Sequence, residues 1–221
     1  WTPSELVLEN SQSEFPWVED AHVLYDDETD RLWMSWGGQD LWVTELDPAT
    51  GRVLGDPENK EVKDHPASMH AKVVSFDGDE SSSNWMEGAA LWKRGPYWYV
   101  FGSYGDLGKD YTIRMGRGES PTGPFYSKEG VKMTERGPDG AYGNSMLLAD
   151  EGRQVVPGHP HLWQEGSSTY MGYDFRLFNM ECHPRSEHDY RNCHSGFLEL
   201  LHSAPRTTSS GIIKQKFEKH L

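Results

Sequence analysis

Short runs of alternating hydrophobic and polar residues, each closed by a turn signal, form the main pattern along this chain. Residues 21–25 and 31–36 alternate in this way and flank the acidic stretch 26–30, which predicts a β-hairpin. Residues 41–46 follow as a third strand and end at a turn that contains Pro48 and Gly51. No stretch before residue 195 has the hydrophobic period of an amphipathic helix. The pattern therefore predicts an all-β protein.

Two further sets of strands repeat this design. The second set comprises residues 89–93, 97–103 and 112–116, and the third comprises residues 145–148, 161–164 and 169–173. A polar motif stands at the head of the hairpin in each set, and the three motifs are spaced by about 70 residues: Glu19-Asp20-Ala21, Glu87-Gly88-Ala89 and Gly158-His159-Pro160. A repeat of this length predicts the blades of a β-propeller, whose inner strands start around one central pocket.

The repeat also predicts how the chain is divided. We expect a partial propeller over residues 1–176, with about three blades at residues 17–60, 85–130 and 143–176, and a divergent C-terminal segment over residues 177–221. Three blades are fewer than the four to eight that usually close a ring.

Composition narrows the classes of partner. The chain has 221 residues and a net charge of −14, which argues against a nucleic-acid partner because phosphate binding needs concentrated Lys and Arg. It contains no apolar run long enough to cross a bilayer, so no membrane partner is expected. Aromatic residues reach 12% and include 9 Trp, which fits an uncharged sugar as the ligand better.

The two cysteines, Cys182 and Cys193, are close in sequence near the C-terminus. A disulfide between them would close a long loop in an oxidising compartment, while two unbridged thiols are the alternative.

The stretch from Trp85 to Phe125 is the most informative part of the chain. Glu87 leads into two aromatic-rich strands, which suggests an acid placed beside a sugar-binding surface. A glutamate before a strand is more often a solvated turn residue, so this position gains weight only from its context.

Four motifs together supply that context: Asp20-Ala21-His22-Val23-Leu24-Tyr25-Asp26 before Leu32-Trp33-Met34-Ser35-Trp36-Gly37; Glu87-Gly88-Ala89; Ile113-Arg114-Met115-Gly116-Arg117-Gly118 with Thr122-Gly123-Pro124-Phe125; and Pro157-Gly158-His159. In their order and spacing they resemble glycoside hydrolase family 43, within it the endo-arabinanase-like branch of five-bladed propellers. The resemblance covers roughly residues 1 to 176. It implies hydrolysis of arabinan- or arabinoxylan-type plant polysaccharide, or of oligosaccharides from it, by a secreted protein.

The resemblance also implies roles for single residues. Glu87 matches the general acid, and Asp20 matches the carboxylate that tunes and orients that acid. His159 matches the histidine that contacts a bound metal ion, often calcium, directly or through water, with His161 as its rival in the motif. Where the family more often has Ala-Pro after the acid, this chain has Gly88 followed by Ala89.

Four residues are candidates for contact with the sugar: Trp36, Gly37, Trp85 and Tyr104. The three aromatic side chains could stack on sugar rings, although a place in the propeller core is the alternative for each.

The general base of the family lies on a first blade that matches nothing in this chain. The resemblance therefore implies a chain that is incomplete at its N-terminus and is a poor catalyst alone, unless a second chain supplies the missing blades. A non-catalytic carbohydrate-binding propeller and an interaction propeller are the alternative functions.

Overall fold

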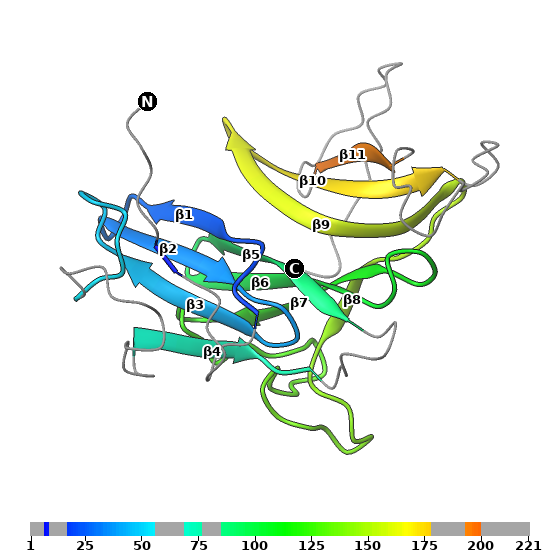
Figure 1. Cartoon of the computed structure of the whole chain (residues 1–221), viewed down its shortest axis with the longest axis horizontal. Coiled ribbons are helices and arrows are strands. Elements are labelled where there is room, and N and C mark those ends of the chain that lie inside the picture. The colour runs from blue at the N-terminus through cyan, green and yellow to red at the C-terminus, as the bar shows by residue number, and fades with distance from the viewer. Residues whose placement is uncertain (1–6, 9–16, 56–68, 77–84, 178–192, 200–221) are drawn as a thin grey trace.

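The computed structural model describes residues 7–8, 17–55, 69–76, 85–177 and 193–199. These residues form eleven β-strands in three antiparallel sheets, as Figure 1 shows. This described part of the chain contains no helix that could span a membrane. The prediction of an all-β protein is confirmed.

The first sheet has the order β1-β2-β3-β4, with β1 at His22–Asp26, β2 at Arg31–Trp36, β3 at Leu41–Leu46 and β4 at His70–Val74. The predicted hairpin is confirmed, since β1 and β2 pair antiparallel from His22 opposite Ser35 to Asp26 opposite Arg31. The hydroxyl of Thr29 donates to Oδ2 of Asp26 at 2.6 Å, which stabilises the turn between them. Strand β4 was not predicted.

The second sheet has the order β5-β6-β7-β8, with β5 at Met86–Arg94, β6 at Tyr97–Tyr104, β7 at Thr112–Gly118 and β8 at Ser145–Leu148. Strand β8 differs from the prediction, which placed it in the third blade. It pairs with β7, and Met115 lies opposite Ser145. The alternation within a short strand shows that it is a strand but does not encode which partner it finds across a long loop.

The third sheet has the order β11-β10-β9, with β9 at Gln154–Glu165, β10 at Ser168–Leu177 and β11 at Cys193–Glu199. Strand β9 begins seven residues before the predicted start at residue 161. The prediction left these residues out because Pro157, Gly158 and Pro160 are typical of a turn. Strand β11 lies in the segment predicted to be divergent, and it pairs along β10. Cys182 lies outside the described residues, so the predicted disulfide is not tested.

The first strand of each sheet lies at the centre of the molecule. Strand β1 contacts β5, and β5 contacts β9, so the innermost strands of the three sheets are neighbours. Each sheet then extends outward from this shared centre, as the blades of a propeller do (Figure 1). The propeller prediction is confirmed, and the segments at the starts of β1 and β5 meet the middle of β9 near one axis.

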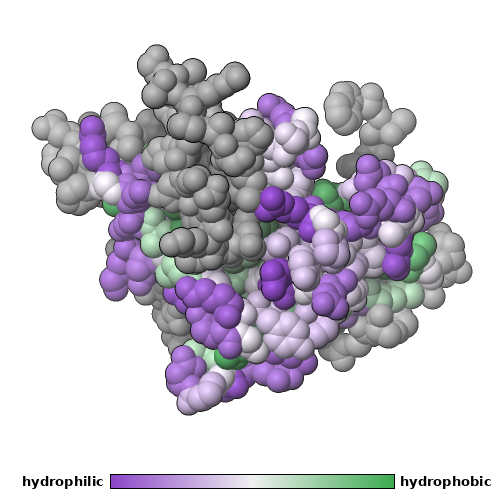
Figure 2. Space-filling model, turned by 180° about the vertical axis from the view of Figure 1, so that it is seen from behind, coloured by the Kyte–Doolittle hydropathy of each residue, from purple (hydrophilic) through white to green (hydrophobic). Residues whose placement is uncertain are grey.

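Apolar side chains between neighbouring sheets hold the blades together. Trp33 and Trp98 meet edge to face with their ring centroids 6.3 Å apart in the core between the first and second sheets. Phe101, Ile113 and Met171 belong to the core between the second and third sheets. Each such side chain contributes about 1.5–3 kcal/mol of burial free energy. On the face that Figure 2 shows, the described residues are largely hydrophilic, and the apolar patches among them are small.

Candidate active site

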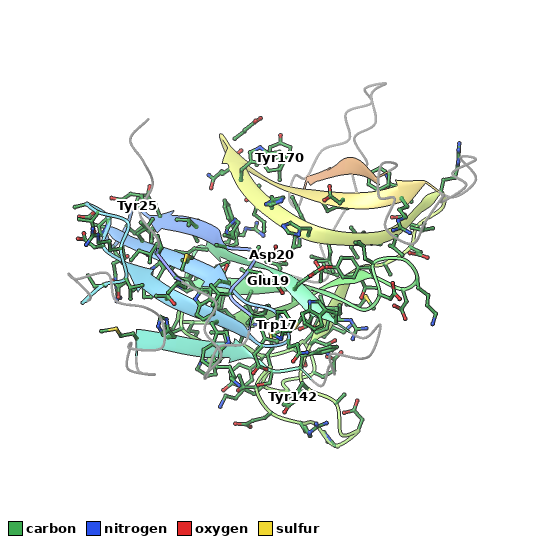
Figure 3. The ribbon with its side chains drawn as sticks, in the orientation of Figure 1. Trp17, Glu19, Asp20, Tyr25, Tyr142 and Tyr170 are labelled. Carbon is green, nitrogen blue, oxygen red and sulfur yellow. The ribbon has the colours of Figure 1, made fainter. Side chains whose placement is uncertain are left out.

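The structure brings together the three residues that the repeat predicted to meet. Asp20 lies two residues before the start of β1, Glu87 is the second residue of β5, and His159 lies in the middle of β9. The backbone N–H of Gly88 donates to Oδ2 of Asp20 at 3.1 Å, and Nδ1 of His159 lies 3.9 Å from the same oxygen. Figure 3 shows Asp20 between β5 and β9. Residues far apart in sequence thus form one cluster at the axis.

The backbone at this cluster is unusual at three points. Asp20 has a φ of 51°, His159 has a φ of 53°, and Gly88 has a φ of 66°. The first two are not glycine, so the surrounding structure holds them in a sparsely populated conformation. Such positions gather at functional sites, where the backbone is bent to aim a side chain or a polar group.

Glu87 has a partner that was not predicted. The hydroxyl of Tyr111 donates to Oε1 of Glu87 at 2.5 Å. The pKa of Tyr111 is raised strongly by burial and by the negative charge of Glu87, so its hydroxyl stays protonated and acts as a donor. In the sequence, Tyr111 stands out only as the residue before the predicted strand at 112–116. Nothing in the sequence connects it with Glu87.

Glu19 is a further carboxylate at the edge of the cluster (Figure 3). Its pKa is raised by burial and then by the charges of Asp20 and Glu87, and a hydrogen bond with the side chain of Trp85 opposes that rise. The side chain packs against Gly38, where no Cβ could be accommodated. The sequence analysis treated Glu19 only as part of the motif that begins the first hairpin.

Two more histidines lie beside the cluster and are uncharged at neutral pH. Burial, and next the neighbouring His161, lower the pKa of His22 to about 4. The pKa of His161 is lowered by burial and by His159, against the opposing charges of Asp174 and Asp20. The rings of His159 and His161 lie 5.1 Å apart.

The donor set around His159 does not by itself form a metal site. Within the residues that the structure describes, no three His, Cys, Asp or Glu side chains are placed to hold one ion. The role of His159 as a metal contact, and calcium as the metal, stay predictions.

Trp36 and Tyr104, two of the residues expected to contact sugar, are instead part of the core. Trp36 is 1% exposed, stacks on Trp42 and donates from Nε1 to Oγ1 of Thr44 at 2.8 Å. Tyr104 is 3% exposed and packs edge to face against Phe76. Side chains enclosed in this way offer no ring face to a ligand, so the prediction of sugar contact by Trp36 and Tyr104 does not fit the structure.

The other two candidates lie next to the cluster. Gly37 is buried, and its N–H donates to the backbone oxygen of Glu19 at 2.9 Å, which ties the segment before β1 to the end of β2. A Cβ on Gly37, whose φ is 114°, would collide with the backbone oxygen of Asp40. Trp85 is half-buried and meets Trp17 edge to face with centroids 5.1 Å apart, so it retains a partly open ring.

A cavity of about 830 Å³ lies elsewhere, over the outer part of the second sheet. Its walls include Tyr97, Arg117 and Tyr126 but neither Glu87 nor Asp20. It is therefore separate from the carboxylate cluster.

Comparison of the sequence with protein families identifies one match over most of the chain. The sequence profile described as glycosyl hydrolases family 43 matches residues 11–179. The chain is 36% identical over 90 residues to a probable arabinan endo-1,5-alpha-L-arabinosidase B of Aspergillus oryzae, covering 35% of this chain and 26% of that protein. It is 29% identical over 161 residues to an extracellular endo-alpha-(1->5)-L-arabinanase of Thermotoga petrophila, covering 70% of this chain and 30% of that protein.

A solved structure supports the same fold. The chain superimposes on Cellvibrio cellulosa alpha-L-arabinanase complexed with arabinohexaose with a TM-score of 0.61 and 20% identity, covering 82% of this chain and 53% of that chain. This likeness confirms the prediction of a propeller of the five-bladed type, of which the described residues contain three sheets. The chain thus spans about half of that structure and less than a third of the two curated relatives.

Proposed function

This chain belongs to glycosyl hydrolases family 43, and we propose that it acts in the hydrolysis of arabinan, with Glu87 as the general acid. Relatives whose names specify 1,5-linked arabinan support the choice of substrate. The observation that carries the proposal is the cluster itself, in which Asp20 accepts a hydrogen bond from the residue after Glu87 and lies 3.9 Å from Nδ1 of His159. Arabinoxylan is the alternative substrate that the sequence left open.

Glu87 is placed to transfer a proton. One of its carboxylate oxygens, Oε1, accepts the hydrogen of Tyr111, and we assign the transfer of the proton to the other oxygen, Oε2. In the reaction, the acid gives its proton to the glycosidic oxygen while the bond from that oxygen to the anomeric carbon breaks. Asp20 accepts a hydrogen bond from the backbone N–H of Gly88, the residue after Glu87, and so anchors the start of β5. We infer that Asp20 orients the acid.

A second carboxylate must accept a proton from water as that water adds to the anomeric carbon. In inverting glycosidases the two carboxyl groups are about 6.5–9.5 Å apart, which leaves room for the water. We assign this general base to no residue of the present chain. We propose that it comes from a further part of the gene product or from a second chain, and that turnover requires it.

The proposed substrate also suggests where the protein acts. Arabinan is a plant polysaccharide too large to be taken up intact, and two curated relatives are named extracellular. We therefore propose that the protein is secreted and that it binds arabino-oligosaccharides at the axis.

The test is the release of reducing sugar from linear arabinan, measured for the present chain and for the whole product of its gene. Glu87→Gln should lower turnover about 10²- to 10⁴-fold, the usual contribution of a general acid. It should leave the binding of arabinohexaose, measured by calorimetry, within a small factor of the parent. Glu165→Gln is the matched control, because Glu165 is exposed at the far end of β9.

Two results would contradict the proposal. Equal turnover in the Glu87→Gln variant would show that Glu87 is not the acid. Binding of arabinohexaose without hydrolysis by the whole gene product would instead indicate a non-catalytic carbohydrate-binding propeller.

A further inference from the structure

Two hydroxyl groups beside Glu87 make short hydrogen bonds. The backbone N–H of His159 donates to Oγ of Ser103 at 2.7 Å. The Tyr111 hydroxyl donates to Oε1 of Glu87 at 2.5 Å. The first bond joins β9 to β6, and the second joins the residue before β7 to β5.

The direction of the second bond follows from the burial of Tyr111. This residue is 2% exposed, and burial raises its pKa, so the hydroxyl keeps its hydrogen. A buried hydroxyl hydrogen needs an acceptor, and Oε1 of Glu87 provides it.

The direction matters when Glu87 carries a proton. A proton on Oε1 would make that oxygen the hydroxyl of a carboxylic acid, which is a weaker acceptor for the buried hydrogen of Tyr111 than a carbonyl oxygen is. A proton on Oε2 leaves Oε1 as the carbonyl oxygen and preserves the bond from Tyr111.

We propose that Tyr111 is a positioning residue that reserves Oε1 of Glu87 as an acceptor and keeps the acid proton on Oε2. The inference rests on the proposed function of Glu87 as the general acid. In the step itself, the proton moves from Oε2 to the leaving oxygen, and the carboxylate that remains keeps its hydrogen bond from Tyr111.

Two glycines make room for this arrangement. A Cβ on Gly158 would overlap the ring of Tyr111, so only glycine at that position lets the ring reach Glu87. A Cβ on Gly88 would lie 2.8 Å from Oγ of Ser103. The glycine that follows the acid in this chain thus leaves space for the side chain of Ser103.

The test compares two substrates in the whole gene product. Arabinan has a poor leaving group and needs the acid, whereas an arabinobioside with a nitrophenyl leaving group does not. Tyr111→Phe should lower kcat on arabinan about 10- to 100-fold and kcat on the nitrophenyl substrate less than about 3-fold, because only acid catalysis is impaired. Tyr173→Phe is the matched control, since it removes a tyrosine hydroxyl that donates to Gln154 far from Glu87.

Equal losses on both substrates, or no loss on either, would overturn the proposal. A second measurement is independent of turnover. In proton NMR, the short hydrogen bond should give a downfield, slowly exchanging hydroxyl signal in the parent and in Tyr173→Phe, and the signal should be absent in Tyr111→Phe. If the parent hydrolyses neither substrate, the proposed function fails, and this signal still decides whether Tyr111 holds Glu87. Its absence from the parent would overturn the inference.

Discussion

Gly88 lies directly against the backbone of His159. A Cβ on Gly88 would stand 3.3 Å from Cα of His159 and 2.8 Å from Oγ of Ser103. This contact joins the inner strands of the second and third sheets beside the proposed acid. The close approach explains why this chain has glycine directly after Glu87.

Gly88→Ala should therefore disturb both stability and catalysis. We expect a loss of about 1–3 kcal/mol in the free energy of unfolding, from strain at positive φ and from overpacking. Turnover of arabinan should fall as well, because strain directly after Glu87 displaces the proposed acid. The control is Gly95→Ala in the β5–β6 turn, where φ is also positive, at 56°, but no atom lies within 4 Å of the added Cβ. Equal effects of the two substitutions in denaturation and activity assays would contradict the role of the contact.

The burial of Trp36 predicts different behaviour from that of Trp85. Trp36→Ala should lower the free energy of unfolding by about 3–5 kcal/mol, because it opens a cavity in the core. Trp36→Phe retains much of the volume and should bind arabinohexaose as the parent does. Trp85→Ala should lower stability less, since Trp85 is only half-buried. A folded Trp36→Phe protein that no longer binds the sugar would show that Trp36 contacts the ligand after all.

His22 should make the protein less stable in mild acid. Its pKa is about 4 in the folded protein and 6.5 without the protein environment, so the unfolded chain takes up a proton first as the pH falls. The stability is full above about pH 6.5 and declines towards pH 4, by at most about 3 kcal/mol. Urea denaturation across this range should show a smaller decline for His22→Gln, which retains an acceptor for the N–H of Leu91. Parallel curves for the two proteins would contradict the assignment.

Glu19 should have the opposite dependence on pH. Burial and the charges of Asp20 and Glu87 raise its pKa above the ordinary value of 4.5, so the folded state favours the protonated form. Its contribution to stability is present below pH 4.5 and is lost as the pH rises through the raised pKa. Glu19→Gln should therefore increase the free energy of unfolding at pH 7 and change it little below pH 4.5. The exposed Glu129→Gln should have no such effect, and a Glu19→Gln protein that is less stable at pH 7 would contradict the prediction.

Much of the fold could be predicted because it is encoded locally. A period of two residues marks a strand wherever it occurs, and so β2 and β3 were predicted with their observed bounds. The polar motifs at regular spacing placed Asp20, Glu87 and His159 at the starts of inner strands or within them, and the structure brings these three residues together.

The remainder depended on contacts between distant segments. The alternation along β2 shows that Trp36 lies on the opposite face of the sheet from its neighbours in sequence. Whether that face is covered depends on the packing of Trp42 and the residues around it. Strand β8 has the pattern of any short strand, and only the path of the preceding loop brings it to β7.

The sequence by itself determined that this chain is a repeated β structure with an acid at the head of one repeat. The tertiary structure alone decided what surrounds that acid. Ser103 lies opposite Glu87 across the pairing of β5 with β6, and Tyr111 reaches Glu87 from the residue before β7. Gly158 comes from the third sheet and lies against the ring of Tyr111. Hydrogen bonds and close packing between sheets depend on distances that local side-chain patterns do not encode, so the partners of Glu87 became visible only in the folded chain.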